Sequence, residues 1–98
     1  MSNTVESTRF LIERRLRDAA LGDANACYDL GVIYSTGTGS IEIDLIEAHK
    51  WFNLAAVSGS EEGQACRAEI SEEMTAREIA EAQRRARGWI AANRRLAA

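Results

Sequence analysis

Apolar residues recur along this chain at the three- and four-residue spacing of a helix surface. The only alternating stretch, "SIEI" at Ser40–Ile43, is four residues long, which is short for a strand. The chain has no proline, so nothing interrupts a helical hydrogen-bond ladder. The pattern predicts an all-α fold with helices over about Thr4–Leu21, Ala24–Ser35, Leu45–Ser58, Glu61–Met74 and from Thr75 onward.

Capping residues mark the boundaries between these segments. Gly22 and Gly59 stand where the first and third helices should end, because glycine adopts the left-handed backbone of a helix C-cap without strain. Asp23, Asp44 and Ser60 are placed to cap the second, third and fourth helices. Thr75 and Glu78 have the spacing of a capping box, so a fifth helix should begin there.

The chain also resembles itself at a fixed interval. "AALGDANA", from Ala19, superposes on "AVSGSEEG", from Ala56, with Gly22 on Gly59 at an offset of 37 residues. A period of 20–50 residues is typical of stacked helical pairs, in which each pair buries its apolar face against a neighbour. We therefore expect a helical-repeat architecture.

One segment carries a specific family pattern. "LGVIYSTGTGSIEIDLIEAHKWFNLAAVSG", from Leu30 to Gly59, resembles a Sel-one-like repeat, a relative of the tetratricopeptide repeat. That pattern reads L-G-x-x-Y-x-x-G-x-G, a short spacer, then D-x-x-x-A-x-x-W-x-x-x-A-A-x-x-G. Eleven residues match it: Leu30, Gly31, Tyr34, Gly37, Gly39, Asp44, Ala48, Trp51, Ala55, Ala56 and Gly59. Ser40 departs from it by making the loop one residue longer.

The resemblance implies a short α-solenoid of about five antiparallel helices in a single helical-repeat domain, residues 1–98. Residues 1–22 resemble a degenerate half-repeat or capping helix, with Arg14 where the tryptophan would stand. Residues 23–59 form the complete repeat. Residues 60–98 resemble the terminal half-repeat and C-terminal capping helix of small bacterial members. A chain of 98 residues is long enough for one domain only.

Gly31 lies inside the predicted second helix, where glycine costs about 1 kcal/mol relative to alanine. We expect that it removes a side chain at a close helix crossing, which Trp51 and Ala55 would fill. Gly37 and Gly39 would then turn the chain tightly enough for the next helix to return antiparallel.

Composition and charge limit the kinds of molecule that this chain is expected to bind. The chain is 46% apolar and 28% charged, with a formal net charge of −3, as in an ordinary globular domain. The charge is uneven, because residues 23–75 hold ten acidic and two basic side chains. The last helix holds six arginines that could contact phosphates: Arg77, Arg84, Arg85, Arg87, Arg94 and Arg95. Nucleic-acid binding is therefore an alternative, although no aromatic residues interleave with these arginines as a stacking platform.

The residues of catalytic and metal sites do not cluster in the sequence. His49 is the only histidine, and Cys27 and Cys66 lie far from it along the chain rather than at ligand spacing. We expect no metal, no cofactor and no catalytic role. The first ten residues lack a signal-peptide pattern and no apolar run could span a membrane, so we expect a cytoplasmic protein with reduced thiols.

The resemblance implies a non-catalytic adaptor or scaffold that binds another protein through its helical surface. The predicted third helix is apolar on two faces, which means that it is buried twice or exposes a patch. The candidate partner-contact residues are Phe10, Ile46, Leu54 and Val57. Either they form an interface, with a homodimer as the first partner to consider, or the first and fifth helices cover them.

Overall fold

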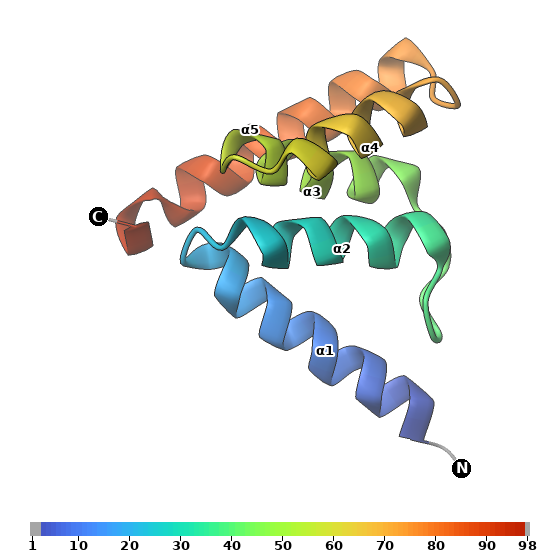
Figure 1. The fold of residues 1–98 in the computed structure, drawn as a ribbon, viewed down its shortest axis with the longest axis vertical. Helices are drawn as coiled ribbons and strands as arrows, with labels where there is room; N and C mark the ends of the chain where they lie inside the picture. Colours follow the sequence, from blue (N-terminus) through green and yellow to red (C-terminus); the bar gives the residue numbers. More distant parts are fainter. Residues whose placement is uncertain (1–2, 98) are drawn as a thin grey trace.

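The computed structural model describes residues 3–97, and it describes side chains from Glu6 to Arg94. Over this range the chain forms five helices and no strand (Figure 1). The helices are α1 (Asn3–Ala20), α2 (Ala24–Thr36), α3 (Leu45–Val57), α4 (Glu61–Ser71) and α5 (Ala76–Ala97). The predicted all-α class is confirmed, and each predicted helix is present with its ends shifted by a few residues.

The third helix, α3, is the centre of the molecule. Helices α2, α4 and α5 all pack against α3. Helix α1 packs on α2, and the carboxyl end of α1 meets α5. The fully buried Trp51 and Phe52 both belong to α3 and contribute to two separate core clusters. The parts of α3 that carry Trp51 and Phe52 are thus both covered by other helices of the same chain, while Val57 at its carboxyl end is exposed. The solenoid arrangement of these helices stays a prediction.

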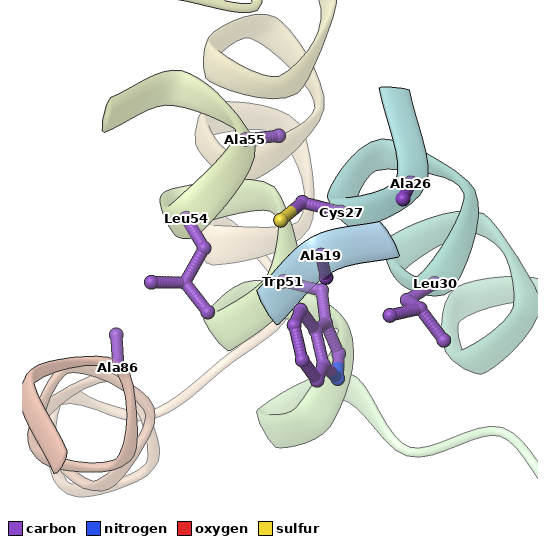
Figure 2. Close-up of a cluster of buried hydrophobic side chains, with 8 residues drawn as sticks. All are labelled: Ala19, Ala26, Cys27, Leu30, Trp51, Leu54, Ala55 and Ala86. Carbon is purple, nitrogen blue, oxygen red and sulfur yellow. The ribbon is translucent and has the colours of Figure 1, made fainter. Parts of the chain in front are cut away.

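The larger core cluster joins all the helices except α4. It contains Ala19 of α1, three residues of α2, three of α3 and Ala86 of α5: Ala19, Ala26, Cys27, Leu30, Trp51, Leu54, Ala55 and Ala86 (Figure 2). The Trp51 and Trp89 rings meet edge to face with centroids 4.8 Å apart, which is a favourable aromatic geometry. Small alanines at the remaining contacts let the helices approach closely.

The predicted caps are present. Asp23 accepts hydrogen bonds from the Asn25 and Ala26 amides. Asp44 and Ser60 likewise accept from the backbone amides of Glu47 and Gly63. At the start of α5, the Glu78 carboxylate accepts from the Thr75 amide at 2.9 Å, and the Thr75 hydroxyl accepts from the Glu78 amide at 3.1 Å. This reciprocal pair is the predicted capping box.

The two turns that superpose in the sequence have the same hydrogen bonds. The Gly22 amide donates to the Ala19 carbonyl and the Gly59 amide to the Ala56 carbonyl, both at 3.0 Å. The next residue donates five positions back in each turn, from Asp23 to Asp18 and from Ser60 to Ala55. Both glycines have positive φ, 90° and 104°. The internal offset of 37 residues therefore corresponds to a repeated helix-to-helix turn.

Glycines bring the neighbouring helices close to α3, and the predicted close crossing at Gly31 is present, although a different side chain fills it. A Cβ at Gly31 of α2 would meet the Phe52 ring, 2.9 Å from its Cγ, so Phe52 fills the crossing. The expectation that Trp51 and Ala55 fill it is wrong, because Trp51 faces Trp89 of α5 instead. On the other side of α3, a Cβ at Gly63 of α4 would lie 2.8 Å from the Ala55 Cβ.

Candidate functional site

An apolar groove opens where the ends of four helices meet. It is formed by the carboxyl ends of α1 and α3, the start of α2 and the second half of α5, and encloses about 230 Å³. Its lining residues are Ala19, Ala20, Gly22, Cys27, Leu54, Val57, Ser58, Trp89, Ile90, Asn93 and Arg94. We call it the apolar groove.

Two aliphatic side chains of this groove are open to solvent. Val57, the last residue of α3, is 67% exposed, and Ile90 of α5 is 38% exposed. Leu21, in the turn beside Gly22, is also exposed. Burial, and to a smaller extent the nearby Asp23 charge, raises the pKa of the Cys27 thiol to about 11. The thiol, which lines the groove, is therefore uncharged at neutral pH. The groove can therefore hold an apolar side chain of a partner.

A second groove, the acidic groove, lies at the other end of α2 and α3. It encloses about 610 Å³ between the loop after α2, the start of α3 and the turn before α5. Its lining residues are Tyr34, Ile41, Glu42, Ile43, Asp44, Leu45, Ile46, Glu73 and Glu78. Because α3 has 13 residues, about 20 Å separates its two ends, and with them the two grooves.

The acidic groove combines carboxylates with aliphatic side chains. Asp44 and Glu78 hold backbone amides as helix caps, whereas Glu42 and Glu73 are exposed and make no ion pair with any described side chain. Ile43 is exposed at the rim. Burial, followed by the Glu47 and Asp44 charges, raises the pKa of Tyr34. Among the described residues, no lysine or arginine lines this groove, so its charged lining is acidic.

The structure separates the four candidate partner-contact residues. Leu54 is only 4% exposed and lies in the core, where Figure 2 shows the Ala86 methyl group pointing toward it. Leu54 is therefore covered by α5 and is not available as an exposed contact residue, because the fifth helix folds over that face of α3. Val57 lies in the apolar groove and Ile46 in the acidic groove. Phe10, 67% exposed, stands on α1 away from both.

The residues of the repeat pattern occupy structural positions. Leu30, Gly31, Ala48, Trp51 and Ala55 are buried, and Tyr34 and Ala56 are half-buried. Gly37, Gly39 and Gly59 have positive φ in turns, and Asp44 caps α3. A Cβ at Gly39 would collide with the Thr8 side chain, so this glycine lets the loop pack against α1.

The carboxylate of Glu47 links α3 to α5, which the sequence reasoning missed. Its Oε1 accepts from Lys50 Nζ at 3.1 Å and from Trp51 Nε1 at 3.2 Å, while its Oε2 accepts from Arg85 at 2.7 Å. Burial opposes its ionisation, but the cations of Lys50 and Arg85 outweigh burial and lower the pKa of Glu47. Lys50 also lies 4.4 Å from the Trp51 ring centroid. This network fixes α5 on α3 and thereby shapes one wall of the apolar groove.

His49 is buried in the structure, with 2% of its surface exposed. Its Nε2 lies 3.1 Å from the Ser71 hydroxyl, which itself donates to the Arg67 carbonyl. Its Nδ1 is buried and has no hydrogen-bond partner among the described residues. Burial, followed by the Arg67 charge, lowers the pKa of His49, so the ring is neutral at pH 7. Within residues 3–97 no three histidine, cysteine or acidic side chains gather as a metal site.

The arginines of α5 fall into two groups. Arg84 and Arg85 both bind Glu81, at 2.7 and 2.8 Å, and these bonds lower the pKa of the Glu81 carboxyl to about 2. The exposed Arg77, Arg87 and Arg94 make no ion pair within the described residues. The side chain of Arg95 lies outside the described residues.

None of the helices in residues 3–97 combines the length and the apolar character needed to cross a membrane. Comparisons of the chain with protein-family models, with curated proteins and with solved structures find no match. The Sel-one-like resemblance thus rests on the residues of this chain alone.

Proposed function

We propose that this protein is a non-catalytic protein-binding module, an adaptor or scaffold, that binds a partner protein through the apolar groove. The observation that carries the proposal is the pair Val57 and Ile90, two exposed aliphatic side chains that border one apolar hollow. Exposed apolar surface that surrounds a concave site is typical of protein-binding sites.

The groove is also preformed, which favours binding. The Trp51–Trp89 contact attaches α5 to α3 at the groove wall, and the Glu47–Arg85 ion pair holds the same two helices together nearer the start of α3. A groove that already has its bound shape spends less free energy on ordering when a partner arrives. The eleven residues that match the Sel-one-like pattern support the same function, because proteins with this repeat present helical surfaces to other proteins.

Nucleic-acid binding through α5 is the second candidate, and fewer observations support it. Arg84 and Arg85 are held by Glu81, so their charges are partly neutralised within the chain. Among the described side chains, Arg77, Arg87 and Arg94 are left for phosphates, on a chain whose net charge is −3. A steep loss of affinity for an oligonucleotide with rising salt would support this candidate.

Site-specific photo-cross-linking tests the proposal. A photoreactive amino acid replaces Val57 in the groove or, as a matched control, Gln64, which is exposed on α4 and lines neither groove. Irradiation in the producing cells should join the Val57 variant, and not the Gln64 variant, to a defined protein identified by mass spectrometry. Identical products from both positions, or none from Val57, would contradict the proposal.

A further inference from the structure

We propose that a second copy of this chain is one partner. The α5 face that carries Arg87, Ile90 and Arg94 in one copy docks into the acidic groove of the other copy. This inference rests on the proposed function and names an occupant for the surface beside the apolar groove. The contact is heterologous, because each copy offers two different surfaces, one basic and one acidic.

The basic face of α5 consists of Arg87, Ile90 and Arg94. Seven residues make nearly two helical turns, so Arg87 and Arg94 lie one above the other with Ile90 beside them. All three side chains are exposed, and neither arginine makes an ion pair within the described residues. The face therefore presents an aliphatic side chain between two unpaired cations.

The acidic groove presents the complementary arrangement. Ile43 is exposed at its rim, with the half-buried Ile46 beside it in the lining. Glu42 and Glu73 line the same groove, and both are exposed and unpaired among the side chains that the structure describes. Opposite charges around matching aliphatic contacts give both attraction and register to an interface.

The two surfaces cannot meet within one chain. The acidic groove lies at the start of α3, whereas Ile90 and Arg94 line the apolar groove at its end, about 20 Å away. Charge is divided in the same way along the chain, with ten acidic and two basic side chains in residues 23–75 and six arginines against two acids in residues 76–98. Such an asymmetry attracts copies of the chain to one another at low ionic strength.

Sedimentation equilibrium of the whole protein tests the inference. The mean mass of the wild type should rise with concentration at low salt and return to that of a monomer at high salt, because the paired charges are exposed to solvent. Two charge-reversal variants, Glu42→Lys/Glu73→Lys and Arg87→Glu/Arg94→Glu, should each weaken association on the order of tenfold. Neither variant removes a cap or an ion pair of the fold.

Two further samples identify the contact. Glu62→Lys/Glu69→Lys makes the same change in net charge as Glu42→Lys/Glu73→Lys, but on exposed positions of α4 that line neither groove, and it should associate like the wild type. An equimolar mixture of the two weakened variants should form a mixed pair, because one retains the basic face and the other the acidic groove. Amide shifts on dilution should then map to Ile43 and Ile90.

A wild type that stays monomeric at low salt up to millimolar concentration overturns the inference, as does association that both charge-reversal pairs leave unchanged. A different protein cross-linked at Val57 in cells, combined with a monomeric wild type, would retain the proposed function and remove the second copy as partner.

Discussion

The ring of Phe52 on α3 lies directly against the backbone of Gly31 on α2, in the space that any side chain at position 31 would need. Phe52 is fully buried, and it also packs against Tyr28 with ring centroids 5.7 Å apart. A close-packed ring of this kind cannot swing aside at low cost. The interior glycine is therefore required by packing, which outweighs its poor helix propensity.

Alanine at Gly31 should destabilise the protein, because its Cβ would need space that the Phe52 ring occupies. We expect Gly31→Ala to cost about 1–3 kcal/mol, the range for overpacked cores. Gly88→Ala is the matched control, because a Cβ at Gly88 on α5 would meet nothing within 4 Å. That variant should gain about 0.5–1 kcal/mol in helix propensity. Urea titration measures both, and equal effects of the two variants would contradict the close contact.

Trp51→Ala should unfold the domain or nearly so. Truncation of a buried aromatic residue costs about 3–5 kcal/mol, and a domain of this size holds about 5–10 kcal/mol in total. Trp51→Phe retains a ring but loses the hydrogen bond to Glu47, so it should cost less. Thermal melts followed by circular dichroism compare the two. A Trp51→Ala variant that melts within a couple of degrees of the wild type would refute the central role of α3.

Glu47→Gln should destabilise the protein by about 1–3 kcal/mol, because it removes the charge that Lys50 and Arg85 share in a half-buried site. Glutamine still offers an oxygen to Trp51, so packing is retained. Glu13→Gln is the control, since the Glu13–Arg9 pair is exposed and should contribute less than 1 kcal/mol. Chemical denaturation of both variants checks this, and equal losses would mean that Glu47 does not link α5 to α3.

Stability should fall as the pH is lowered from about 7 through the ordinary histidine pKa toward the lower folded-state pKa of His49. Burial and the Arg67 charge lower its pKa in the folded state, so the unfolded chain, with an ordinary histidine pKa near 6.5, binds the proton more readily. Lowering the pH through that window therefore favours unfolding, while stability is flat with respect to this group above it. His49→Gln should remove the dependence, since the chain has no other histidine. An unchanged pH profile in that variant would show that another group is responsible.

Local features of the fold could be predicted from the sequence because short-range chemistry determines them. Each helix cap bonds a backbone amide no more than three residues away along the chain, so residue spacing identifies it. This applies to Asp23, Asp44 and Ser60 and to the capping box at Thr75. Gly22 and Gly59 were recognisable for the same reason.

Contacts between distant segments could not be predicted in this way. Phe52 and Trp51 are neighbours on α3, and only the packing of α2 and α5 decides which of them meets Gly31. The same holds for Leu54, which α5 covers, and for Glu47, whose partner Arg85 lies 38 residues away. Both grooves are made of helix ends that the sequence does not bring together, although Ile46 and Val57 were identified as candidates.

The most direct test of the account is recovery of a partner protein by the wild type and by a groove variant. Val57→Asp/Ile90→Asp places two charges on exposed positions of the apolar groove, so the fold should be retained, as a thermal melt would verify. Phe10→Ser is the control, because Phe10 is exposed far from the groove. Affinity purification with quantitative mass spectrometry should recover a defined protein with the wild type and with the Phe10 variant. The groove variant should recover at least tenfold less of that protein. Equal recovery by a folded groove variant would contradict a binding role for the apolar groove.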